Sequence, residues 1–379
     1  MKRNDAPDTL SRGAEAAFPG GSAGEDSRGK RLQELLDAER DAGLIGAFAQ
    51  VRDGDLTRSL VTGVADVTTG EPPRADFRHR VGGVIKSFVA VVVLRLAGEG
   101  RLDLDAPVGR YLPEVVPGDR GRRITVRMLL NHTSGIGDYL ERFYATTEKM
   151  AEAGTRTFTP LELVRMGLAM PPTGPAGDNW SYANTNYIIL GLLIERITGR
   201  PYGDELRERV LGPLGLTGTS LPGTDPGIRG PHQRAYLPMA DGSVRDCTSY
   251  HMSAFWAAGE LISTAADVNT FYRALLRGEV LEPGLLREMK DTVPFSPKAP
   301  DAGGYGLGIL WFGSRRGRMW GHNGLAAGHT TYCSNSEDAT TQVTLAETYN
   351  LYEPLGSHSH PITTARQAFT DEVMSGSED

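Results

Sequence analysis

Three short segments of the chain carry side chains that could act together on a carbonyl group. They place Gly83 and Lys86 at the start of an apolar stretch, Tyr182 and Asn184 in the middle of the chain, and His322 near its end. A residue at a helix N-terminus and the residue three positions later share one helix face, so Lys86 should lie beside position 83. The free N–H groups of such a terminus favour an oxyanion.

Lys86 and Tyr182 are the candidates for moving a proton. A free lysine has a pKa of about 10.4 and a free tyrosine of about 10, so neither accepts a proton readily at pH 7 unless its surroundings shift the pKa. If the two side chains lie close together, the lysine charge favours the phenolate, and burial favours the neutral lysine.

The order and spacing of the segments carry a resemblance to a known family. The motif residues are Gly83 and Lys86, Tyr182 and Asn184, and His322 and Gly324. From about residue 43 to about residue 347 the chain resembles the serine β-lactamase and penicillin-binding family. This family includes class C β-lactamases, Streptomyces-type D-alanyl-D-alanine carboxypeptidases and esterases of the same fold. Its pattern is Ser-x-x-Lys, then Tyr-x-Asn, then Lys- or His-x-Gly.

The resemblance implies a role for each matching side chain. Lys86 and Tyr182 would share the proton transfer, Asn184 would orient the substrate amide, and His322 would help to tune Tyr182. The site would lie in a cleft between two domains.

The resemblance also implies an oxyanion hole made by the backbone. Its two N–H groups would come from Gly83 and from Leu325, which follows the turn formed by Asn323 and Gly324. The family pattern implies neither a metal nor an organic cofactor.

The first motif departs from the family pattern at two positions. Gly83 stands where the family has its nucleophilic serine, and Ile85 stands where it usually has threonine or serine. Loss of the serine in a well-studied protease costs on the order of a million-fold in rate, yet about a thousand-fold over water remains. Glycine keeps its N–H group, so we expect a site that retains the oxyanion hole but cannot form a seryl acyl-enzyme.

Two hypotheses about function follow. In the first, the protein is a serine-type hydrolase or transacylase acting on an ester, amide or thioester of a small molecule or peptide in secondary metabolism, and Gly83 is an engineered replacement that stops turnover. In the second, the departure is natural, and the protein is a ligand-binding pseudoenzyme or uses Lys86 and Tyr182 without a covalent intermediate. Ile85 favours the second hypothesis, because a designed knockout would change one position only. The joint retention of Lys86, Tyr182, Asn184 and His322 favours the first, which is the function we expect.

Other nucleophile candidates are weaker. Ser134, in the segment His132-Thr133-Ser134-Gly135, lacks the Gly-x-Ser-x-Gly elbow, and the family uses this segment as a structural loop. Ser87 points about 100° away from Lys86 around the helix. Cys247 and Cys333 are too few for a disulfide scaffold or a four-cysteine zinc site and are interpreted as structural thiols.

The pattern of apolar residues predicts the elements that position these groups. Helices are expected over 27–43, 86–98, 125–131, 187–198, 202–211, 267–276 and 362–374. Strands are expected over 47–51, 59–64, 305–312, 318–321, 330–333 and 341–347. Strands at both ends of the chain with helices between them predict an α+β fold of the β-lactamase type, an antiparallel sheet flanked by helices plus a mostly helical second domain.

The expected boundaries follow from this arrangement. Residues 1–26 form a flexible N-terminal arm, 27–78 and 265–379 the sheet domain, and 79–264 the mostly helical domain.

The composition of the chain argues against nucleic acid and membrane as its partners. The 379 residues include 40 Lys plus Arg and 47 Asp plus Glu, a formal net charge of −7, which argues against nucleic acid. No apolar run reaches the roughly 18 residues of a membrane span, and no apolar segment follows Lys2 and Arg3 as in a secretory signal. We therefore expect a cytoplasmic protein whose partner is a small-molecule or peptidyl acyl substrate.

Overall fold

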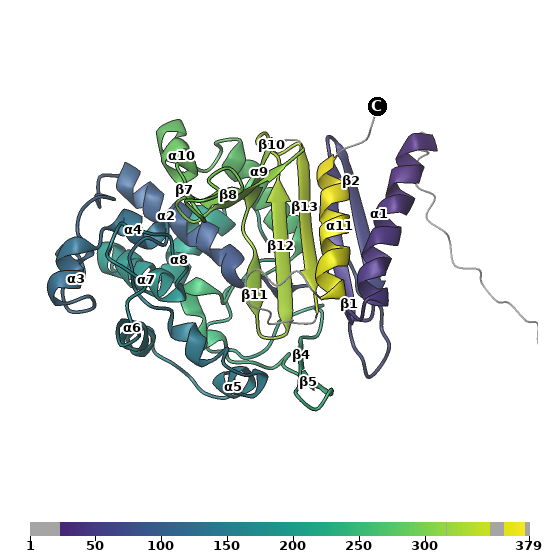
Figure 1. The fold of residues 1–379 in the computed structure, drawn as a ribbon, viewed down its shortest axis with the longest axis horizontal. Coiled ribbons are helices and arrows are strands. Elements are labelled where there is room, and N and C mark those ends of the chain that lie inside the picture. The colour runs from purple at the N-terminus through teal and green to yellow at the C-terminus, as the bar shows by residue number, and fades with distance from the viewer. Residues whose placement is uncertain (1–22, 316, 349–359, 376–379) are drawn as a thin grey trace, which may run out of the picture.

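A nine-stranded antiparallel sheet runs through the computed structural model, which describes residues 23–315, 317–348 and 360–375. Both ends of the described chain contribute to it, because β1 pairs with β2 on one side and with β13 on the other (Figure 1). In spatial order the strands are β2 (Leu56–Gly63), β1 (Gly46–Asp53), β13 (Thr341–Glu347), β12 (His329–Asn335), β10 (Gly317–Gly321), β9 (Leu310–Ser314), β8 (Gly303–Tyr305) and β7 (Val293–Pro294), while β11 (Gly324–Ala326) pairs with β12.

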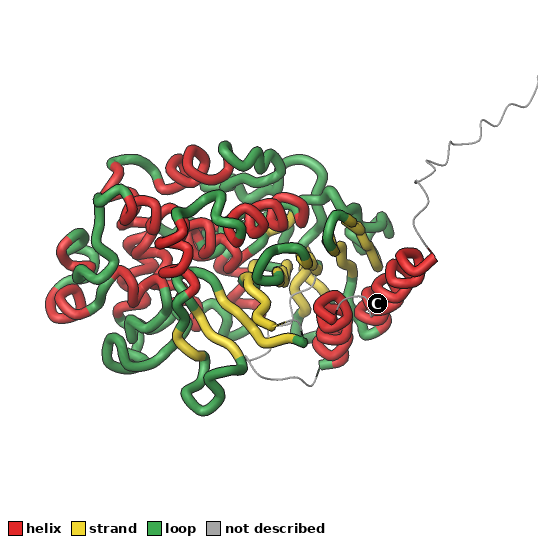
Figure 2. The backbone as a smooth tube through the Cα atoms, turned by 90° about the horizontal axis from the view of Figure 1, so that it is seen from above, coloured by secondary structure: helices red, strands yellow, loops and turns green. Residues whose placement is uncertain are grey.

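Helices cover both faces of the sheet. Helices α1 (Ala23–Asp41) and α11 (Pro361–Ser375) lie side by side on one face, where they bury alternate strand residues such as Ala47 and Leu345 (Figure 2). Helix α9 (Ala265–Leu276) packs on the other face, where the Asn269 side chain bonds to strand residues. The period of two along β1 and β13 divides these two faces.

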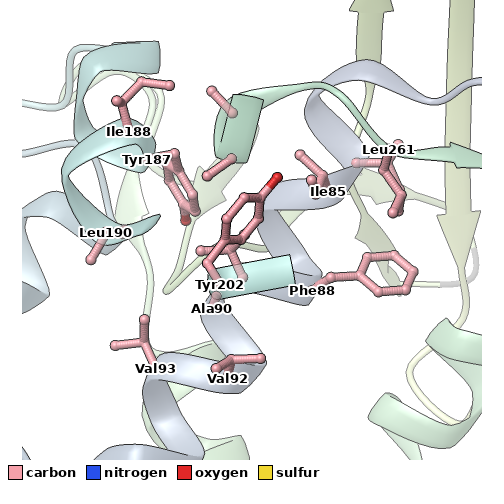
Figure 3. Close-up of a cluster of buried hydrophobic side chains, with 14 of the residues drawn as sticks. Ile85, Phe88, Ala90, Val92, Val93, Tyr187, Ile188, Leu190, Tyr202 and Leu261 are labelled. Carbon is pink, nitrogen blue, oxygen red and sulfur yellow. The ribbon is translucent and has the colours of Figure 1, made fainter. Parts of the chain in front are cut away.

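The remaining helices gather beside the other end of the sheet. They surround α2 (Ile85–Gly98), whose residues from Ile85 to Leu94 are all buried, and its side chains meet those of α7 (Asn184–Thr198) in one apolar cluster (Figure 3). The other helices are α3 (Gly118–Arg123), α4 (Val126–Leu130), α5 (Thr147–Ala153), α6 (Pro160–Leu168), α8 (Tyr202–Leu206) and α10 (Pro283–Lys290). Two short ladders complete this part, β3 (His79–Arg80) with β6 (Ile262–Ser263) and β4 (Tyr236–Pro238) with β5 (Val244–Asp246).

The predicted α+β class with its antiparallel sheet is confirmed, and one predicted element is wrong. The single strand expected over 305–312 is two strands, β8 and β9, separated by a turn at 306–309. Gly308 in this turn has φ +79° and lies so close to α2 that a Cβ there would be 2.4 Å from the Cβ of Ala90. Close packing of this turn against α2 interrupts the strand, and the alternation of apolar residues gives no sign of that packing.

The predicted N-terminal arm and the predicted domain boundaries are not tested by the structure. The predicted arm falls outside the described residues up to residue 22, and α1 begins at Ala23. The division into a sheet domain and a helical domain stays a prediction. Among the described residues no helix combines the length and apolar character that a membrane span needs.

Candidate active site

A tight turn brings the first motif against the third. Gly82 and Gly83 form a turn of 3-10 helix immediately before α2, and Gly82 has φ +54°, a conformation that side chains rarely adopt. A Cβ on Gly82 would lie 2.5 Å from the carbonyl oxygen of Leu325 in β11. The sequence therefore needs glycine here, and the backbones of the two predicted oxyanion-hole residues, Gly83 and Leu325, lie on neighbouring segments.

Position 83 faces the predicted catalytic side chains. A Cβ built on Gly83 would lie 3.1 Å from the Tyr182 hydroxyl oxygen and 3.1 Å from Cε1 of His322. It would also lie 2.8 Å from the carbonyl oxygen of Asn323, closer than Cβ atoms normally approach a backbone atom. The structure thus brings the three motifs together, and a side chain at position 83 would require the Asn323 carbonyl to shift.

Lys86 is fully buried beneath this point. Its Nζ donates hydrogen bonds to Oδ1 of Asn184 at 2.8 Å and to the carbonyl oxygen of Ala258 at 2.6 Å, and it lies 4.9 Å from the centre of the Tyr182 ring. Burial penalises the ammonium form and lowers the pKa of Lys86 to about 7. A side chain that is normally charged is therefore poised between its two protonation states at neutral pH.

Asp138 belongs to the same group, although no sequence motif pointed to it. Its Oδ2 accepts a hydrogen bond of 2.8 Å from Nδ2 of Asn184, so the amide of Asn184 bridges Lys86 and Asp138. Burial raises the pKa of the partly exposed Asp138 carboxyl, while its charge raises the pKa of Lys86. The only available signal was its place three residues after the His132–Gly135 loop.

Tyr182 lies at the mouth of the group and is partly exposed. Burial, and then the charge of Asp138, raise its pKa well above the usual value for tyrosine. This is opposite to the expected stabilisation of the phenolate by Lys86. Burial outweighs the attraction of Lys86, whose ammonium lies over the ring and bonds to Asn184 and Ala258 rather than to the Tyr182 hydroxyl.

His322 is a neutral imidazole in this site, because burial lowers its pKa to about 3. Its Nδ1 lies 2.5 Å from the carbonyl oxygen of Asn323, which requires the proton on Nδ1. Its Nε2 is then an acceptor, and the Tyr305 hydroxyl donates to it at 2.8 Å. The ring centres of His322 and Tyr182 are 6.3 Å apart, so Tyr305, not Tyr182, is the hydrogen-bonding partner. Sequence reasoning missed Tyr305 because it assigned this residue to a continuous strand.

Residues His132 to Ser134 form hydrogen bonds and a ring contact with the second motif and with the start of α7. Nδ1 of His132 accepts a hydrogen bond from the Ala183 N–H at 3.2 Å, and the two rings of His132 and Tyr182 are 4.3 Å apart. The Ser134 hydroxyl donates to Oδ1 of Asn186 at 2.7 Å. The segment therefore holds Tyr182 and the start of α7 in place.

The other sequence candidates lie in the core. The Ser87 hydroxyl donates to the Gly308 carbonyl oxygen at 2.6 Å and bonds to the Tyr272 hydroxyl at 2.9 Å. Burial raises the pKa of the Cys247 thiol to about 11 and that of Cys333 to about 12, which disfavours the reactive thiolate. Within the described ranges, no group of three or more His, Cys, Asp or Glu side chains is arranged to hold a metal ion.

Comparison with known proteins agrees with this geometry. The family model described as Beta-lactamase matches residues 31–356. Esterase EstB of Burkholderia gladioli is 34% identical over 221 residues, which make up 56% of this chain and 55% of the esterase. The chain therefore spans about half the length of this curated relative.

Two solved structures are similar over nearly their whole length. The D-stereospecific amidohydrolase from Streptomyces sp. is 39% identical, with a TM-score of 0.78 and coverage of 84% of this chain and 94% of that chain. The D-amino acid amidase from Ochrobactrum anthropi SV3, complexed with L-phenylalanine amide, is 26% identical, with a TM-score of 0.79 and coverage of 92% and 98%. The resemblance inferred from the three motifs is thereby confirmed, as is the prediction of a hydrolase family.

Proposed function

The chain belongs to the beta-lactamase family, and we propose that it binds a D-amino-acid amide, peptide or ester at the family's site without forming a seryl acyl-enzyme. The observation that carries the proposal is the packing around Gly83. A residue with a side chain at this position would press on the Asn323 carbonyl, so the site is closed around glycine. Ile85 supports the hypothesis of a natural departure, because an engineered replacement would change one position only.

The class of ligand follows from the relatives and from the charges of the site. One similar structure is named a D-amino acid amidase and the other a D-stereospecific amidohydrolase, and a D-amino-acid amide carries an ammonium group close to its carbonyl. The Asp138 carboxylate is partly exposed beside Asn184 and offers an acceptor for this ammonium group. The placement in secondary metabolism and the cytoplasmic location stay predictions.

Calorimetric titration with D-phenylalanine amide, followed by an assay for released ammonia, tests the proposal. We expect saturable binding, recovery of the intact amide, and weaker binding by the Asp138→Asn variant. Absence of saturable binding by the native chain would contradict the proposal. Release of ammonia at a rate typical of an enzyme, on the order of 1 per second or faster, would contradict it as well.

A second candidate function, slow hydrolysis without a covalent intermediate, is favoured by the protonation of Lys86. With a pKa of about 7, neutral Lys86 could take a proton from a water molecule as the resulting hydroxide attacks the amide carbonyl. Lys86 would then give this proton to the amide nitrogen, so that ammonia leaves and the carboxylic acid remains. In that case ammonia is released slowly, the rate rises as the pH passes through about 7, and the Lys86→Met variant abolishes it. A slow rate that Lys86→Met leaves unchanged would exclude this function.

A further inference from the structure

Three aromatic side chains lie in a row between the candidate active site and the protein surface. The ring centres of Trp180 and Phe295 are 4.8 Å apart, and those of Phe295 and Phe312 are 5.3 Å apart. The rings meet at 66° and 36°, respectively, in the edge and tilted arrangements that aromatic pairs prefer. We refer to Trp180, Phe295 and Phe312 as the aromatic row.

The inner end of the row reaches the site. Trp180 lies two residues before Tyr182, and its ring centre is 6.2 Å from that of Tyr305. The Tyr305 hydroxyl bonds to His322, and Tyr305 lies 6.3 Å from Tyr182 between ring centres. The row therefore packs against Tyr305, a fully buried neighbour of both His322 and Tyr182.

The backbone of β8 makes room for the row. Gly303 is paired with Phe312 across β8 and β9, and a Cβ on Gly303 would lie 2.8 Å from the Phe295 ring. Glycine at this position lets Phe295 lie against the strand next to Phe312. The neighbouring residue, Trp311, points to the opposite face of the sheet and is buried, whereas Phe312 is exposed.

Phe312 differs from the other large exposed apolar side chains because it is aromatic. Its relative exposure is 46%, and large exposed apolar side chains in the described part of the chain are otherwise aliphatic, namely Leu56, Val67, Leu161 and Val244. Covering an exposed aromatic ring with another apolar group is favourable by about 25 cal/mol per Å² of apolar area removed from water. A row of rings that starts near the candidate site and ends in solvent offers apolar contacts to the side chain of a ligand.

We propose that the aromatic row binds the aromatic or large apolar side chain of the ligand whose carbonyl lies at Gly83. This inference rests on the proposed function and specifies its ligand as one with a bulky apolar side chain. The row contributes affinity and selectivity between ligands. It has no part in proton transfer.

The test compares two ligands that differ only in side chain, D-phenylalanine amide and D-alanine amide, by calorimetry. The native chain should bind the phenylalanine ligand more tightly. An aromatic contact contributes about 0.5–1.5 kcal/mol, so Phe312→Ala should weaken binding of this ligand by a factor of about 2 to 13 and leave the alanine ligand unchanged. Phe295→Ala should act in the same direction. Leu56→Ala, which truncates an exposed apolar residue on β2 at the far edge of the sheet, is the matched control and should change neither affinity.

Two outcomes would overturn the inference, and they are distinguishable. If both ligands bind but Phe312→Ala and Phe295→Ala leave the ratio of their affinities unchanged, the aromatic row is not the subsite, while the proposed function stands. If neither ligand binds to the native chain, the proposed function fails, and the subsite fails with it. Melting temperatures of the variants identify any loss of folding. Phe312→Ala is expected to fold because the residue is exposed.

Discussion

Two regions of this protein bury charged side chains, and they compensate the charge in different ways. In the cluster between the sheet and its outer helices, Arg366 of α11 donates to both carboxylate oxygens of Glu347 in β13, at 2.5 and 2.8 Å. In the candidate site, Lys86 has only an amide oxygen and a backbone carbonyl oxygen as hydrogen-bond acceptors. The first arrangement is a paired bidentate contact, and the second leaves the cation without a direct carboxylate.

A third side chain, Glu39, lies in the same cluster as Arg366 and Glu347. Glu39 of α1 is fully buried, and burial together with the neighbouring charge of Glu347 raises its pKa to about 10. Glu39 is therefore neutral at pH 7. The contact between Arg366 and Glu347 fastens α11 to the sheet.

In the candidate site, the nearest carboxylate, Asp138, reaches Lys86 only through the amide of Asn184. Because the compensation is incomplete, burial dominates and the pKa of Lys86 falls to about 7. A buried cation that is hydrogen-bonded directly to a carboxylate, such as Arg366, stays charged. A buried cation with only neutral acceptors, such as Lys86, can lose its proton at neutral pH.

The largest effect is expected from breaking the paired cluster with Arg366→Met. This change leaves Glu347 buried and unpaired, and we expect it to lower the free energy of unfolding by about 3–5 kcal/mol at pH 7 in urea denaturation. Glu39→Gln is the control, because Glu39 is already neutral and its replacement should cost far less. A loss below about 1 kcal/mol for Arg366→Met would show that the pair does not fasten the helix.

Lys86→Met should instead act through the pH dependence of stability. The folded pKa is about 7 and the unfolded value 10.5, so between these pH values the unfolded chain binds the proton that folded Lys86 has released. The free energy of unfolding of the native chain should therefore rise with pH from about 7 to 10 relative to that of Lys86→Met. Urea denaturation of both proteins at several pH values measures this difference, and a difference that stays constant over the range would contradict the account.

A smaller effect is expected from Asp138→Asn, which removes the distant carboxylate. Since the charge of Asp138 raises the pKa of Lys86, its loss should move that pKa further below its usual range. The pH at which Lys86 loses its proton, followed by NMR of a labelled side chain, should then decrease. Asp55→Asn, at an exposed turn between β1 and β2, is the matched control and should leave it unchanged. An increase in Asp138→Asn would mean that Asp138 does not act on Lys86 by its charge.

Much of the fold was predictable because local patterns determine it. The alternation of apolar residues predicts β1, β2 and β13, and the continuous apolar run after Lys86 predicts the buried helix α2. The helix expected from Tyr187 begins at Asn184, within the second motif. Boundaries of this kind depend on tertiary contacts that a single sequence does not report.

The candidate site was predictable only at its motif positions. The motifs identify Gly83, Lys86, Tyr182 and His322, which the fold brings together. Asp138 reaches Lys86 across the fold through Asn184, and Tyr305 reaches His322 from a neighbouring strand. The raised pKa of Tyr182 follows from its burial and from the nearby charge of Asp138, neither of which the motif spacing reports.

Intact-protein mass after incubation with an activated D-phenylalanine ester and with a penicillin tests the central claim most directly, that Gly83 stands at the nucleophile position and prevents acylation. The native chain and Gly83→Ala should gain no acyl group, whereas Gly83→Ser should gain one acyl mass, which Lys86→Met in the same background removes. Gly83→Ala introduces the same Cβ contact with Asn323 without a hydroxyl, so it controls for packing. Acylation of the native chain at the site, or a folded and ligand-binding Gly83→Ser protein that gains no mass, would contradict the account.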